Sequence, residues 1–209
     1  MVKVIRNWAL LIAVLLPAAI FAQEQPESEE APAETEATDD SGQQTESDLA
    51  IGTEAEPPVG ATYDVQKIKD WSVRCVKTEN GNDPCRLHQL LRDAQGTPVA
   101  EINFFTVPEG GPVAAGASVV TPLETLLTEQ VRLSVDAGKA LVYPFRFCIQ
   151  TGCISRMGFT PDELEQFKRG ANARIIIVPA NAPDAEVVLE ISLSGFTAGF
   201  ETLSALPAE

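Results

Sequence analysis

Short segments in which apolar and polar side chains alternate recur along the chain between residues 70 and 193. In Asp70–Val76 the apolar side chains of Trp71, Val73 and Cys75 occupy every second position, as on the buried face of a β-strand. Turn-forming residues separate such segments about every ten residues, a spacing typical of β-sandwiches and barrels. The pattern predicts an all-β domain, either a β-sandwich or a partly closed barrel. Its strands are expected at residues 70–76, 85–91, 99–107, 130–135, 139–149 (interrupted by Pro144), 153–157, 174–178 and 186–193.

Two short helices are expected among these strands. In the first, Thr160 can cap the helix, Pro161 suits the first helical position, and Glu163 can complete a capping box. This helix would turn two apolar side chains toward the core and end at a glycine: Leu164, Phe167 and Gly170. The second helix is expected after Ser194-Gly195, where three large apolar side chains recur at helical spacing: Phe196, Phe200 and Leu203.

The first 22 residues have the pattern of a secretory signal peptide. The basic residues Lys3 and Arg6 precede a fourteen-residue apolar block, Trp8–Phe21, and Ala22 suits a cleavage site. A helix that crosses a bilayer needs about 20 apolar residues, so this block, which Pro17 also interrupts, is too short to span. The pattern predicts cleavage after Ala22, and the alternative is an uncleaved anchor. The remainder is expected to be periplasmic or secreted, with no further membrane-spanning segment.

Residues 23–60 form a segment of unusual composition. They contain twelve acidic side chains, no Lys or Arg, and only three apolar side chains larger than alanine, which are Leu49, Ile51 and Val59. Such a segment buries too little apolar surface to offset the entropy of ordering it. The composition therefore predicts a disordered acidic linker and places the folded domain at residues 61–209.

Charge limits the partners that the domain can have. Residues 61–209 carry 13 basic and 18 acidic side chains, so that their net charge is −5, whereas the whole chain carries −15. The basic residues form no stripe along the sequence. Nucleic acids and anionic membrane surfaces are therefore not expected as partners.

All four cysteines lie in the predicted domain: Cys75, Cys85, Cys148 and Cys153. An even number of cysteines in an oxidising compartment indicates disulfide bonds, and four cysteines allow three pairings. The two local pairings are favoured, because residues 80–84 and 151–152 provide turn-forming sequences inside them. Redox-active and zinc-binding alternatives are disfavoured, since the spacings differ from Cys-x-x-Cys and the chain has one histidine.

No recognisable set of catalytic residues is present. The single histidine, His88, alternates with Leu87 and is interpreted as a surface or edge-strand side chain rather than a general base. The acidic pair Asp162 and Glu163 is explained by the first turn of a helix, where acids complement the helix dipole. Glycines within residues 109–117 lack the lysine and helix of a phosphate-binding loop. We therefore predict no catalytic residue, no cofactor, no metal site and no enzymatic activity.

Several motifs together resemble the invasion-associated locus B family of alphaproteobacteria. They are Trp71–Cys75, Cys85, Val131–Gly138, Phe147-Cys148 with Cys153, and Leu193–Phe196, in this order. The resemblance covers residues 63–206, and the acidic linker is not part of it. It implies a secreted or periplasmic protein whose founding relatives are linked to invasion of host erythrocytes. The family has no known catalytic residues that could be transferred to this chain.

Three functional hypotheses follow, in order of preference. The first is a protein that contacts an envelope or extracellular protein or glycan through loops, for which the glycine-rich segment 108–121, read as a mobile loop, is the first candidate. The second is a periplasmic small-ligand-binding protein with a cavity between sheet and helices. The third is a hydrolase in which two acids converge in a cleft. The missing catalytic set and the family resemblance favour the first.

Overall fold

The computed structural model describes residues 52, 53 and 55–206. The predicted signal peptide, 1–22, and most of the predicted linker, 23–60, lie outside the described residues and remain predictions. Within the described part, eleven strands, two α-helices and a short 3₁₀ helix follow one another along the chain. These elements are β1 (Thr62–Ile68), β2 (Trp71–Val76), β3 (Cys85–Arg92), β4 (Pro98–Phe105), β5 (Ala115–Thr121), η2 (Leu127–Glu129), β6 (Val131–Val135), β7 (Leu141–Tyr143), β8 (Phe145–Ile149), β9 (Gly152–Phe159), α1 (Pro161–Arg169), β10 (Asn172–Ile177), β11 (Val187–Ser192) and α2 (Phe196–Ser204).

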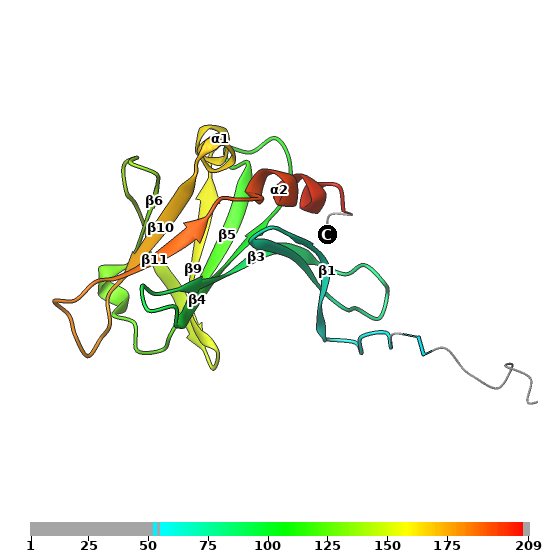
Figure 1. Cartoon of the computed structure of the whole chain (residues 1–209), viewed down its shortest axis with the longest axis horizontal. Coiled ribbons are helices and arrows are strands. Elements are labelled where there is room, and N and C mark those ends of the chain that lie inside the picture. The colour runs from blue at the N-terminus through cyan, green and yellow to red at the C-terminus, as the bar shows by residue number, and fades with distance from the viewer. Residues whose placement is uncertain (1–51, 54, 207–209) are drawn as a thin grey trace, which may run out of the picture. The chain divides into compact units, whose positions relative to one another are not determined.

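The strands form two antiparallel sheets (Figure 1). The larger sheet has seven strands in the order β1-β2-β3-β4-β5-β9-β8, and the smaller has four in the order β11-β10-β6-β7. The chain passes from the small sheet to the large one at Pro144, which separates β7 from β8. Proline cannot donate a hydrogen bond to a sheet, so an interruption is expected at this position. The predicted all-β fold with two helices is confirmed.

A cluster of aromatic rings fills the space between the large sheet and the helices. Trp71, Phe104, Phe159, Phe167 and Phe196 are fully or almost fully buried. Their rings pack mostly edge-to-face or tilted, with centroids 4.9 to 5.8 Å apart. Because Phe167 belongs to α1 and Phe196 to α2, the cluster holds both helices against the sheets at the same end of the strands (Figure 1). Side chains occupy the region in which the small-ligand hypothesis places its cavity.

The first helix begins as predicted. The Glu163 backbone N–H donates to Thr160 Oγ1 at 3.4 Å, and the Thr160 N–H donates to Glu163 Oε2 at 2.8 Å, which completes a capping box. Leu164 and Phe167 face the core, and Gly170 follows the last helical residue. The role of Glu163 is therefore structural. The second predicted helix is also confirmed, because α2 buries Phe196, Phe200 and Leu203.

The predicted mobile loop at residues 108–121 is wrong in its second half. Ala115–Thr121 forms β5, which lies between β4 and β9 near the middle of the large sheet. Its small residues reflect close packing: a Cβ at Gly116 would lie 2.1 Å from the ring of Phe105. Ala115 and Ala117 are fully buried. A composition typical of loops therefore belongs here to a strand on which aromatic rings pack closely.

The first strand has no counterpart in the prediction. No position of β1 is buried: five of its seven residues are exposed and two are partly buried, so the strand has no buried face to mark with alternating apolar residues. It pairs with β2 through an irregular register between Asp64 and Gln66. Immediately before it, the Gly60 N–H donates to Lys77 O at 2.8 Å. The backbone contacts of the domain thus begin slightly before residue 61.

Candidate functional site

Both predicted disulfides are present. Cys75 and Cys85 lie opposite each other on β2 and β3, and Cys148 and Cys153 do so on β8 and β9. Each bond therefore cross-links two neighbouring strands within the large sheet. Cys75 and Cys153 are buried. The position of the bonds across paired strands is that of structural disulfides, as the sequence predicted.

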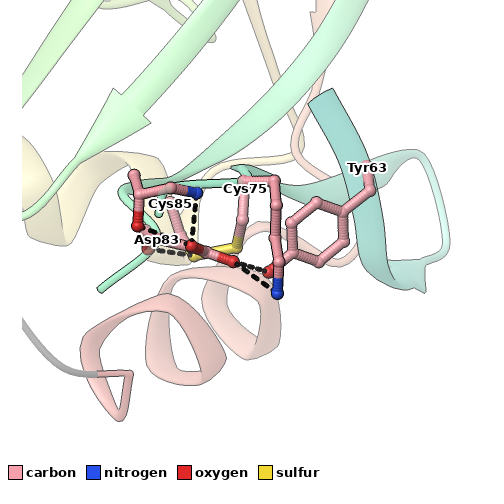
Figure 2. Close-up of a disulfide and its surroundings, with 6 residues drawn as sticks. Tyr63, Cys75, Asp83 and Cys85 are labelled. Atoms are coloured by element: carbon pink, nitrogen blue, oxygen red, sulfur yellow. Dashed lines mark hydrogen bonds and ion pairs between the residues drawn. A yellow bond between two sulfur atoms is a disulfide. The ribbon is translucent and has the colours of Figure 1, made fainter. Parts of the chain in front are cut away.

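Asp83 organises the loop that the first disulfide closes (Figure 2). Its carboxylate accepts hydrogen bonds from Tyr63 Oη at 2.7 Å and from the Thr78 N–H at 2.7 Å. Lys77 Nζ lies 3.8 Å from the same carboxylate. The hydrogen bond from Tyr63, and to a smaller extent that from the Thr78 backbone, lowers the pKa of Asp83. The hydrogen bond between Tyr63 and Asp83 also raises the pKa of Tyr63. These contacts satisfy Asp83 within the loop and tie β1 to it.

His88 is not the surface or edge-strand side chain that the sequence predicted. It lies on β3, between β2 and β4, and is only 6% exposed. Its Nδ1 is 3.1 Å from Asn103 Oδ1 and 3.8 Å from the Glu101 carboxylate. Burial, and then the nearby Arg74 guanidinium, lowers the pKa of His88, so the ring is neutral at pH 7. Polar side chains of the adjacent strands cover the imidazole ring. The pattern of residues along β3 alone does not reveal this cover.

The described residues contain no group of three or more His, Cys, Asp and Glu side chains placed to hold a metal ion. In the same part of the chain, no helix is long and apolar enough to cross a membrane. Asp162 and Glu163 lie in the first turn of α1, as predicted. The cysteines and the acidic pair singled out in the sequence thus have structural roles. The candidate site is a different feature of the surface.

That feature is an open cleft of about 630 Å³ between β11 and the ends of two hairpins. Four separate parts of the chain line it: residues 67–70, residues 89–94, Asn172 at the start of β10, and alternate positions of β11. β3 contributes to the cleft because it is longer than its neighbour. Ser72, near the start of β2, lies opposite His88, so the stretch Leu90–Arg92 extends beyond β2.

Ser192, the last residue of β11, lines the cleft and is held by hydrogen bonds to neighbouring segments of the large sheet. Its N–H donates to Gln89 Oε1 at 2.9 Å, and its carbonyl oxygen accepts from Gln89 Nε2 at 3.0 Å and from Trp71 Nε1 at 2.8 Å. Its hydroxyl donates to Asp70 Oδ2 at 2.6 Å. The side-chain amide of Gln89 thus binds both backbone groups of Ser192, as a neighbouring strand would do.

The backbone of β11 faces the cleft beyond this point. Successive residues of a strand direct their N–H and C=O groups to opposite edges. Because those of Ser192 point toward Gln89, those of Glu190 and Val188 point toward the cleft, away from β10. β11 is the terminal strand of its sheet, so no strand pairs with it on this side, although β3 of the large sheet comes close to it near Ser192. The cleft is therefore bordered by an unpaired strand edge.

The side chains of the cleft combine apolar and basic groups. Leu90 and Val188 are 45% and 44% exposed, although both are large apolar residues. Lys67 and Lys69 form no ion pair with the described residues. Two of the acids already accept hydrogen bonds: Asp70 from Ser192, and Asp93 from the backbone N–H groups at 95 and 97. Glu190 lies in register with Arg174 on β10 and forms no ion pair with the described residues. Two lysines are thus available to a ligand.

The cleft thus combines an unpaired strand edge with apolar and basic side chains. Sequence reasoning did not find the cleft, since residues 67–70 and 89–94 are far along the chain from residues 172 and 188–192, and each is unremarkable in its own strand. The only local signal was Gln89, a polar residue at an inward-facing position of a strand.

Comparison with known proteins identifies the family. A family model described as Invasion associated locus B (IalB) protein matches residues 71–204. This chain belongs to the invasion-associated locus B family. The match spans the two sheets from β2 onward, both helices and both disulfides. The resemblance seen in the sequence motifs is confirmed.

Individual IalB-family proteins support the same assignment. Invasion protein B homologues from two strains of Brucella abortus are each 27% identical to this chain over 150 residues, which cover 71% of this chain and 84% of theirs. The crystal structure of invasion associated protein B from Bartonella henselae matches with a TM-score of 0.54 and 25% identity. That match covers 68% of this chain and 95% of the Bartonella chain.

Proposed function

We propose that this IalB-family protein is a non-enzymatic interaction protein of the periplasm or cell exterior, and that it contacts another protein through the cleft beside β11. The observation that carries the proposal is the unpaired edge of β11 next to two half-exposed apolar side chains, Leu90 and Val188. An edge strand is a template for pairing with another chain. The cleft is also lined by side chains from four segments that the fold holds in place.

The proposed location rests on two features. The N-terminal pattern is that of a secretory signal, and the domain holds two disulfides, which persist in oxidising compartments. The relatives named above are described as invasion proteins, which supports a role in contacts of the bacterial envelope or of a host cell. The polypeptide edge favours a protein over a glycan, because backbone N–H and C=O groups in a row match another backbone.

Site-specific photo-crosslinking in the native organism tests this proposal. A photoreactive amino acid replaces Leu90 in the cleft, and the control replaces Val142, which is 53% exposed on β7, the edge of the small sheet opposite to β11. We expect a discrete protein adduct from position 90 and none from position 142. The adduct should disappear when Val188→Asp is introduced into the same chain. Equal adducts from both positions, or none from position 90, would contradict a role for the cleft.

A glycan partner would give a different result. Position 90 would then yield carbohydrate-bearing adducts that glycosidase treatment removes, and the protein-binding proposal would be wrong.

A further inference from the structure

The cleft has a geometry that specifies how a partner binds. We propose that an extended segment of the partner, bearing acidic residues at its N-terminal end followed by alternating apolar residues, adds as an antiparallel strand to the edge of β11. The inference rests on the proposed function, because it names the binding mode and the chemistry of the partner at the same site.

The first argument is that β11 lacks three of the devices that protect strand edges, which are a bulge, short length and proline. Four strands lie at sheet edges: β1, β7, β8 and β11. β1 has a register shift between Asp64 and Gln66, β8 has one between Phe145 and Phe147, and β7 has only three residues. Bulges and short length are devices that prevent edge-to-edge pairing. β11 has six residues in continuous register with β10 and contains no proline. It is thus the edge best suited to accept a strand.

The second argument is that this edge already binds an amide. Gln89 donates to the carbonyl of Ser192 and accepts from its N–H, with distances of 3.0 and 2.9 Å. A residue of an added antiparallel strand, through its own N–H and C=O, would make the same pair of contacts with Glu190, the next residue whose backbone faces the cleft. Gln89 therefore occupies the first position of the ladder and leaves the following positions open.

The third argument concerns the direction and composition of the added segment. β11 runs toward Ser192, which is hydrogen-bonded to Asp70, next to Lys69 in the β1–β2 turn and close in sequence to Lys67 at the end of β1. The N-terminus of an antiparallel segment would lie at that end, next to Lys67 and Lys69. Carboxylates at this terminus would complement the two ammonium groups. Further along, Leu90 and Val188 border the cleft and would contact apolar side chains at alternate positions.

The experiment uses a synthetic probe and the domain in its disulfide-bonded form. The probe is a capped peptide in which two glutamates precede alternating leucine and threonine, and a peptide of the same composition in scrambled order is the control. Hydrogen exchange measured by NMR reports on individual amides. We expect the probe to slow exchange at the amides of Val188 and Glu190 and to leave that of Val142 unchanged. The scrambled peptide should have no effect.

Two sets of variants separate backbone pairing from other contacts. Val188→Pro removes an N–H that faces the cleft, while Val142→Pro makes the same change at the opposite edge of the sheet. Loss of a hydrogen bond and the bulk of the proline ring should weaken probe binding about tenfold for Val188→Pro and leave it unchanged for Val142→Pro. Lys67→Glu should weaken binding of the acidic probe. Lys139→Glu, which lies far in the sequence from the cleft segments, should leave binding of the probe unchanged.

Because Val188→Pro can disturb folding, the same question is also asked from the peptide side. Two further probes carry N-methyl groups, one at the odd-numbered and one at the even-numbered residues, so that each cannot donate backbone hydrogen bonds from its methylated positions. We expect at least one of these two probes to lose binding to the unmodified protein. Binding that tolerates both sets of N-methyl groups, or that leaves exchange at Val188 and Glu190 unchanged, would overturn strand addition.

The outcomes distinguish this inference from the proposed function. If position 90 crosslinks to a partner in cells while the probe does not bind, strand addition by an acidic–apolar segment is wrong and the cleft still contacts a protein. If position 90 gives no adduct and the probe does not bind, both proposals fail.

Discussion

Replacing Trp71 with alanine is expected to remove a large part of the domain's stability. The side chain is fully buried, and its ring packs against Phe104 and Phe196 with centroid distances of 5.8 and 5.3 Å. Its indole N–H also donates to Ser192 O at 2.8 Å, which links the large sheet to the end of β11. Truncation of a buried Trp to Ala costs about 3–5 kcal/mol. Because two aromatic contacts and one hydrogen bond are lost together, we expect a value near the top of that range.

The measurement is urea denaturation at pH 7, followed by far-UV circular dichroism. Circular dichroism is needed because Trp8 and Trp71 are the only tryptophans and Trp8 lies in the predicted signal peptide, so the variant would lose its fluorescence. Trp71→Phe is the companion variant, since it keeps an aromatic ring and removes the N–H. It should cost about 1–2 kcal/mol.

Two results would refute this reasoning. A loss below about 1.5 kcal/mol for Trp71→Ala would show that the ring contributes much less than a core residue does. Equal losses for Trp71→Ala and Trp71→Phe would show that the hydrogen bond to Ser192, and not the packing of the ring, dominates.

Three further predictions concern the disulfides, the Asp83 loop and the linker. Cys148→Ser should lower the free energy of unfolding by about 2 kcal/mol, because the disulfide closes a short loop. Thiol titration of the unfolded variant should find one reactive thiol, at Cys153. An unchanged Tm would contradict a stabilising disulfide. Asp83→Asn should lower the Tm at pH 7. The pKa of Asp83 is lower in the folded than in the unfolded protein, so ionised Asp83 stabilises the fold above the unfolded pKa, and this stabilisation is lost as pH falls below about 4. Thermal melts should therefore show the Tm difference between Asp83→Asn and the wild type shrinking toward pH 3. A Tm difference that grows toward pH 3 would oppose this assignment. Deleting residues 23–57, which spares the Gly60–Lys77 hydrogen bond, should leave the Tm unchanged, and calorimetry showing a lower Tm would contradict the linker prediction.

Local patterns in the sequence were sufficient for many elements. In β2 the alternation of Trp71, Val73 and Cys75 corresponds to alternate buried positions, because each strand residue faces the side opposite to its neighbour. The start of α1 was predictable because Thr160 and Glu163 satisfy helix-end groups within four residues of each other. The disulfide pairing followed from turn residues between the cysteines. Each of these features depends on residues close together in the chain.

The errors concern residues whose environment comes from distant segments. β5 was read as a loop because alanine and glycine are poor strand formers, and only the position of the Phe105 ring explains why Gly116 suits a strand. His88 was placed at the surface because neighbouring strands that cover it have no signature in its own sequence. The cleft was missed for the same reason, since its walls are formed by residues 67–70, 89–94 and 188–192. The environments of β5, His88 and the cleft thus depend on packing between distant segments, which a local sequence pattern does not encode.

The size of the open edge limits how tightly a single segment can bind there. Val188 and Glu190 direct two N–H and two C=O groups toward the cleft, and at about 1 kcal/mol net for each hydrogen bond these would contribute about 4 kcal/mol. Covering the exposed parts of Leu90 and Val188 would add about 2 kcal/mol, and the two lysines about 1 kcal/mol together. Association itself costs at least about 4 kcal/mol. The remaining few kcal/mol correspond to a Kd in roughly the millimolar range for a short peptide. A partner that binds more tightly must therefore contact surface outside the cleft or be held nearby, and a second contact would raise the effective concentration of the segment. For this reason, the probe should be titrated to millimolar concentration, whereas the crosslink in cells should form with the complete partner alone.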